Sequence, residues 1–161
     1  MGAHELSALL WQERELLELL VFKLEEEQLL LTTGKTRWLQ HATREVESVL
    51  ERLRSAGLAR TVEVASLSGE WGTADDATLR ELAGQAPDGP WGDIFSSHLA
   101  AMTELTVEIR TLRDANQQFL RAAARSTQET LSRLNPDAGL YDSRGASDTP
   151  SDNAHLFDKD L

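Results

Sequence analysis

The chain has 161 residues with 27 acidic and 16 basic side chains, and it contains no cysteine. The formal charge of −11 repels phosphate backbones and anionic lipid headgroups, so we expect no nucleic-acid or membrane-surface partner. Without cysteine there is no disulfide framework or thiol nucleophile, and a reducing compartment fits. The start resembles no signal peptide, and charges such as Glu13 and Lys23 interrupt the leucine-rich run. We therefore expect a cytoplasmic protein with no membrane insertion.

Leucines at helical spacing predict one long amphipathic helix from about residue 6 to residue 31. Its stripe consists of Leu6, Leu10, Leu17, Leu20, Leu24 and Leu31. Glu13 and Glu27 interrupt that stripe, and the neighbouring run 25–27 is predicted to be a solvated acidic face. Further leucines beside the stripe widen the apolar side, so the helix should meet more than one neighbour. They either pack against the connector described below or offer a groove to a partner.

A tight break at residues 33–36 predicts a second helix antiparallel to the first. Gly34 suits a left-handed C-terminal position, and Thr36 is expected to cap the next helix. The second seam consists of Leu39, Ala42, Val46, Val49, Leu53 and Ala56. Gly57 is a possible stop. We predict continuation to about Gly69, because an interior glycine costs a helix only about 1 kcal/mol.

Residues 68–92 are rich in glycine and proline and read as a connector with one short helix at 75–83, capped by Thr73 or Asp75. A third long helix is predicted at about 93–134. Its stripe consists of Phe95, Met102, Leu105, Ile109, Leu112, Asn116, Phe119 and Ala123. The sequence thus predicts an all-α protein: an elongated antiparallel bundle of three long helices with a short connector helix. We expect a helical domain at 1–135 and a flexible, disordered acidic tail at 136–161.

No catalytic, cofactor or metal site emerges from the sequence. The segment 33–36 contains the Gly-Lys-Thr that closes a P-loop. The first glycine of a P-loop should stand five positions before Gly34, but that position is Leu29. A predicted helix also precedes the segment where a P-loop needs a strand. Neither His41 nor His98 has the glutamate three residues earlier that a di-iron bundle needs. We therefore expect no enzyme activity and no cofactor.

Five segments carry a resemblance to a known family; they lie at 6–20, 58–60, 78–83, 115–120 and 140–145. In their order and spacing the chain resembles the FlgN-type flagellar export chaperones, in an arginine-rich form, over nearly its whole length. The resemblance implies a cytoplasmic chaperone that binds the hook-associated proteins FlgK and FlgL before type III export.

The resemblance also implies where partners bind. The client's terminal helix would lie on the last part of the third helix and the segment after it, and a tyrosine there would dock the complex on the export gate. Carried onto this chain, the partner-binding residues are Asn116, Phe119, Leu120, Leu131, Leu134, Leu140 and Tyr141. For Asn116 two interpretations stay open: it fixes the register of a helical seam, which we favour, or it bonds an incoming backbone.

Two other classes remain as alternatives. A helical hairpin exported by a type VII system has a Trp-x-Gly turn, but Trp71-Gly72 and Trp91-Gly92 lack the spacer. In that family's tail signal an acidic residue stands four positions after the tyrosine, whereas here Gly145 stands four positions after Tyr141. A structural coiled-coil interaction protein fits the heptads, although the connector and the glutamates interrupt a continuous seam.

Overall fold

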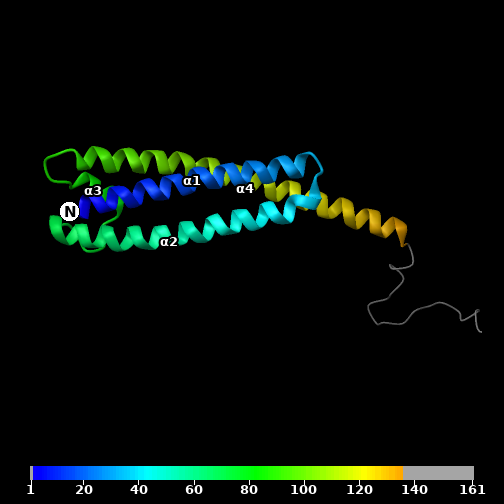
Figure 1. Ribbon diagram of the computed structural model, residues 1–161, viewed down its shortest axis with the longest axis horizontal. Coiled ribbons are helices and arrows are strands. Elements are labelled where there is room, and N and C mark those ends of the chain that lie inside the picture. The colour runs from blue at the N-terminus through cyan, green and yellow to red at the C-terminus, as the bar shows by residue number, and fades with distance from the viewer. Residues whose placement is uncertain (1, 136–161) are drawn as a thin grey trace, which may run out of the picture. The chain divides into compact units, whose positions relative to one another are not determined.

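The computed structural model describes residues 2–135, and helices make up most of them. In chain order these are α1 (Gly2–Thr32), a short 3-10 turn η1 (Thr36–Trp38), α2 (Leu39–Trp71), α3 (Leu79–Gly84) and α4 (Trp91–Leu134). No strand occurs in this part of the chain. Figure 1 shows α1 and α2 side by side in opposite directions, so the predicted all-α fold is confirmed.

The chain divides into two compact units, Met1–Leu120 and Arg121–Leu161. The first contains α1, α2, α3 and the larger part of α4, and the second contains the end of α4. The predicted tail at 136–161 lies outside the described residues. None of the helices within 2–135 is long and apolar enough to cross a membrane.

The turn after α1 is partly as predicted. Gly34 adopts a left-handed conformation with φ 70°, and the Lys35 amide donates to the Leu30 carbonyl over 3.0 Å. The prediction that Thr36 caps the second helix is wrong. Thr36 lies inside the 3-10 turn, and α2 begins at Leu39 without any side-chain cap.

The second helix continues through Gly57, as predicted, and ends at Trp71. Gly72 then takes the left-handed position that allows the chain to leave the helix, with φ 67°. Four residues of the predicted seam, Ala42, Val46, Val49 and Ala56, are buried.

The connector helix is shorter than predicted and has a different cap. It begins at Leu79, and Thr78 with Glu81 forms a reciprocal capping box: each side chain accepts a hydrogen bond from the other's backbone amide. Thr73 instead belongs to the end of α2, because its amide donates to the Ser68 carbonyl over 2.9 Å. The Thr-x-x-Glu pattern was visible in the sequence and is the stronger signal.

Two clusters form the core of the first unit. The larger one gathers buried side chains of α1, α2, α3 and α4 around Phe95, whose ring lies between those of Trp71 and Trp91 at 6.0 and 5.7 Å. The smaller one joins Leu20 and Leu24 of α1 to Val46 and Val49 of α2, with Ile109 and Leu112 of α4 against it. Both tryptophans of the candidate type VII motif therefore serve in packing.

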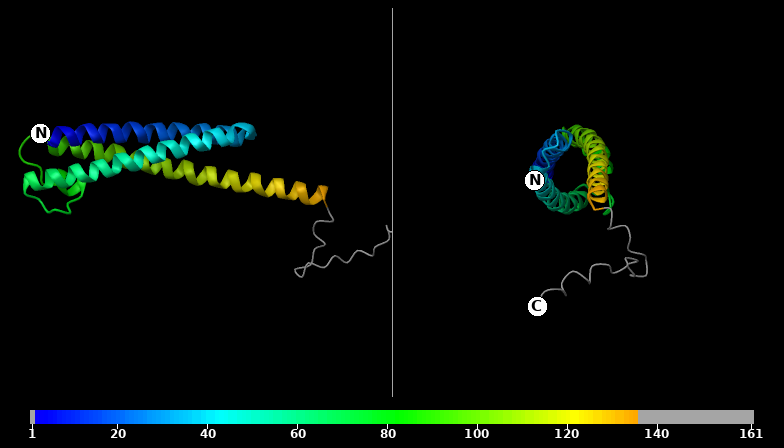
Figure 2. Two further views of the ribbon diagram at one scale, coloured as in Figure 1. Left: turned by 60° about the horizontal axis from the view of Figure 1, so that its bottom comes forward. Right: turned by 90° about the vertical axis from the view of Figure 1, so that its right-hand side faces the viewer.

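Within the first unit α4 runs in the same direction as α1, as Figure 2 shows. Its predicted stripe is buried or half-buried from Phe95 to Asn116. The prediction fails beyond that point, because Phe119 and Ala123 are exposed. The packed length of α4 therefore ends about one turn after Leu112.

Candidate functional site

A partly buried ion pair joins α1 and α2 in the middle of the bundle. Arg60 Nε donates to Glu13 Oε2 over 2.7 Å, and the Glu13 side chain is almost fully buried. A glutamate in the leucine stripe is therefore compensated by a cation from the neighbouring helix. Periodicity revealed the interruption at Glu13 but not its partner, because the two residues are 47 positions apart.

A second polar contact lies where the packed part of α4 ends. Asn116 is only 2% exposed, and its Nδ2 donates to the Leu24 carbonyl over 2.9 Å and to Glu27 Oε1 over 3.3 Å. Thr43 of α2 donates to the other Glu27 oxygen over 3.3 Å. Three helices are thus joined at one point.

This contact bears on the two interpretations of Asn116. Its Nδ2 is bonded to α1, which agrees with the register-fixing role, whereas its Oδ1 is buried without a hydrogen-bond partner among the described residues. It also corrects the prediction for the acidic run at 25–27. Glu27 is buried in this network, whereas Glu25 is exposed.

A buried histidine adds a third polar feature between α1 and α4. His98 lies edge-on to the Trp11 ring at 5.0 Å, and Arg14 Nη1 is 3.4 Å from His98 Nδ1. The Arg14 guanidinium also covers the Trp11 ring at 4.5 Å. Burial, together with the Arg14 charge, lowers the pKa of His98 below its ordinary value. The neutral imidazole is therefore the form that packs here.

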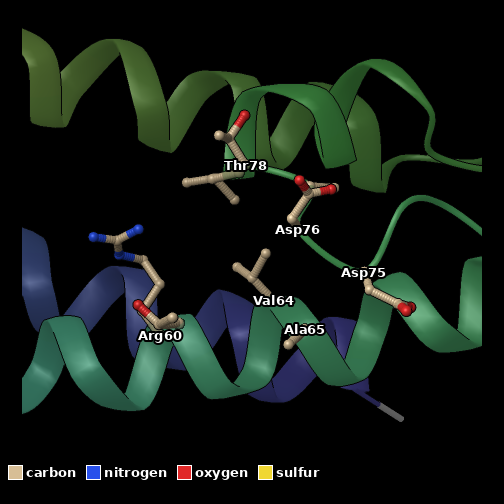
Figure 3. Close-up of a pocket in the computed structure, with 9 residues that line it drawn as sticks. Arg60, Val64, Ala65, Asp75, Asp76 and Thr78 are labelled. Carbon is tan, nitrogen blue, oxygen red and sulfur yellow. The ribbon is translucent and has the colours of Figure 1, made fainter.

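A hollow in the first unit lies between α2 and the connector, with Arg60, Val64 and Ala65 on one side and Asp75, Asp76 and Thr78 on the other (Figure 3). Two of its polar side chains are committed elsewhere. Arg60 is paired with Glu13, and Thr78 caps α3. The hollow is thus best explained as the junction of the connector with α2.

The end of α4 carries most of the predicted partner-binding residues that the structure describes. Phe119 and Leu120 are exposed at the end of the first unit. In the second unit, Leu131 and Leu134 are 61% and 76% exposed. Leu140 and Tyr141 lie outside the described residues. The described members of the predicted set are thus one buried residue, Asn116, and four exposed apolar ones.

The end of α4 also carries a positive charge that helical periodicity does not reveal. Between residues 121 and 134 the chain has three arginines, Arg121, Arg125 and Arg133, against one glutamate, although the whole chain carries −11. All three are exposed, and none forms an ion pair with a carboxylate of the described residues. A local count of charge would have revealed this basic segment within an acidic protein.

Comparison with known proteins identifies the family. A family model described as FlgN protein matches residues 1–149, which include every described residue. No curated protein and no solved structure matches the chain. On the family match, which spans far more than half of its length, the chain belongs to the FlgN family of flagellar export chaperones.

Proposed function

We propose that this chaperone binds the hook-associated proteins FlgK and FlgL in the cytoplasm and delivers them to the flagellar export gate. The observation that carries the proposal is the change along α4. Its packed stripe ends at Asn116, yet large apolar side chains continue to Leu134 and are exposed. The FlgN family consists of export chaperones, which hold client proteins. Exposed apolar side chains on a helix of such a protein are best explained as contacts for a client.

The spacing of these side chains suits an amphipathic helix as the client. In the second unit Ala124, Thr127, Leu131 and Leu134 follow one another at intervals of three and four residues, which places them on one side of α4. A client helix laid along this side would remove Leu131 and Leu134 from water, and full burial of a leucine contributes about 1.5–3 kcal/mol. We call Phe119, Leu120, Leu131 and Leu134 the client surface. Asn116, which is bonded to α1, lies just before its first residue.

The client surface can be tested by matched pairs of substitutions. The double variant Leu131→Ser/Leu134→Ser, and separately Phe119→Ser/Leu120→Ser, should weaken binding of a FlgK terminal-helix peptide at least about tenfold, measured by titration calorimetry. Leu58→Ser/Val62→Ser serves as the control, because Leu58 and Val62 are also large, exposed apolar residues but lie on α2. The proposed client surface is wrong if both α4 variants bind the peptide as tightly as the control variant does.

Delivery to the gate is assigned to Tyr141, with Leu140 beside it extending the client contact. Aromatic side chains are favoured anchors in protein interfaces, and the resemblance to the family supports this role for the tyrosine. Tyr141→Ala should leave client affinity nearly unchanged and weaken binding to the cytoplasmic domain of the export gate. Loss of client binding in this variant, or unchanged gate binding, would contradict the proposed division of roles.

A further inference from the structure

The side of α1 that faces away from the core has an ordered pattern of its own. Six exposed residues follow one another at alternating intervals of four and three positions; they are Trp11, Glu15, Glu18, Phe22, Glu25 and Leu29. This spacing places all six along one line of the helix. The buried stripe of α1, which includes Leu6, Leu10, Leu20 and Leu24, lies on the opposite side. We call the six residues the outer face of α1.

The apolar members of the outer face are large and well exposed. Phe22 and Leu29 are 55% and 65% exposed, and about half of Trp11 is exposed although it also contacts His98. Single exposed apolar residues are ordinary on a protein surface, but here three share one line of one helix. Trp11 and Leu29 are 18 residues apart, which corresponds to about 27 Å at a rise of 1.5 Å per residue. The outer face is therefore long enough to accept about five turns of a partner helix.

The polar members of the outer face all carry negative charge. Glu15, Glu18 and Glu25 are exposed, and none forms an ion pair among residues 2–135. The two aromatic rings already accept cations from α1 itself, since Arg14 lies 4.5 Å from the Trp11 ring and Lys23 lies 5.3 Å from the Phe22 ring. These ring faces are therefore already occupied, and the three carboxylates are the groups that favour positive charge in a partner.

We propose that the outer face of α1 docks a basic amphipathic helix of another protein. Apolar side chains of that helix would contact Trp11, Phe22 and Leu29, while its lysines or arginines would pair with the three glutamates. The surface differs in charge from the exposed end of α4, where arginines outnumber glutamates. The two surfaces therefore select partners of opposite charge, and the proposal stands independently of the client surface.

The test uses the full chain and a synthetic helical peptide of about 20 residues, with leucines along its seam and lysines beside it. Phe22→Ser/Leu29→Ser and Glu15→Lys/Glu18→Lys/Glu25→Lys should each weaken peptide binding at least about tenfold by titration calorimetry. Trp11 is kept because it packs against His98. The matched controls are Leu58→Ser/Val62→Ser on α2 and Glu47→Lys/Glu104→Lys/Glu108→Lys on α2 and α4, which make the same chemical changes at exposed residues of other helices. They should change the affinity less than about twofold.

Three results would overturn the proposal. The first is that the charge-reversal variant of the outer face and its charge-reversal control weaken peptide binding equally, which would show that the peptide is attracted by net charge alone. The second is unchanged binding by Phe22→Ser/Leu29→Ser in a variant that keeps the helicity of the parent. The third is a dimer of the parent chain in sedimentation that becomes a monomer in this variant, because a second copy would then cover the outer face. Leu131→Ser/Leu134→Ser should bind the basic peptide normally, so failure of the client surface and failure of this proposal remain distinguishable.

Discussion

The packed and exposed parts of α4 belong to one continuous helix of 44 residues but are held by different forces. Between Phe95 and Asn116 the helix is fixed by tertiary contacts, including an aromatic cluster and a buried amide. From Gln117 to Leu134 every residue is exposed, so helix propensity and the preceding turns hold the segment. The difference teaches that a single periodic pattern can serve stability in one half of a helix and remain available for binding in the other.

The comparison is tested most strongly by two phenylalanines of the same predicted stripe. Phe95 is fully buried and Phe119 is 42% exposed. Phe95→Ala should lower the free energy of unfolding by about 3–5 kcal/mol, because it leaves a cavity between two tryptophans. Phe119→Ala should change it by less than about 0.5 kcal/mol. Urea unfolding measures both values, and similar losses would show that the end of α4 is packed in solution.

Asn116 marks the border between the two parts and should have the next largest effect. Asn116→Ala removes the donor to Leu24 and Glu27 and leaves a buried carboxylate with one partner fewer. We expect a loss of about 1–3 kcal/mol of stability in the same unfolding experiment. A variant as stable as the parent would mean that the amide does not hold α4 against α1.

The packed part should also respond to pH through His98. Its pKa is lower in the folded chain than its ordinary value of 6.5, so the unfolded chain binds the proton more readily. The stabilising contribution is complete above pH 6.5 and is lost as the pH falls through the lowered pKa. Unfolding measured at intervals below pH 6.5 should show declining stability, with a shallower decline in His98→Gln. Equal slopes for parent and variant would assign the decline to other groups.

The smallest effect is expected in the exposed part. Ala124→Gly should cost the local helix about 1 kcal/mol, because glycine is a poor helix former and no packing compensates for it. Amide exchange should accelerate between Arg121 and Leu134, while the midpoint of urea unfolding stays unchanged. A shift of that midpoint would show that this segment contributes to the stability of the bundle.

Much of the fold could be predicted from periodicity. The long helices and the passage of α2 through Gly57 follow from local patterns of apolar residues, and these predictions are confirmed. The short helix begins later than predicted, because the Thr78–Glu81 capping box sets its start and neither Thr73 nor Asp75 caps it. Tertiary partners were beyond local patterns: nothing near Glu27 in sequence indicates that Asn116 lies against it, 89 positions away.

The candidate site was only partly predictable for the same reason. Spacing alone extends the stripe of α4 through Phe119 and Ala123, because periodicity does not reveal where the tertiary packing of a helix ends. α1 ends at Thr32, and its last contact with α4 through a polar side chain is made at Glu27. The three-dimensional structure places the border of the packed part at Asn116, and the local spacing of apolar residues does not encode this border.

The hydrogen bond from Asn116 to the Leu24 carbonyl also determines how far fraying can travel. Helix ends open and close readily, and an opening that starts near Leu134 meets no tertiary obstacle until it reaches this amide. Opening past it would expose a buried amide and a buried glutamate together, which costs far more free energy than the opening of any preceding residue. The end of α4 can therefore bend or unwind to suit a client, and reform after release, while the bundle stays folded through repeated cycles of loading.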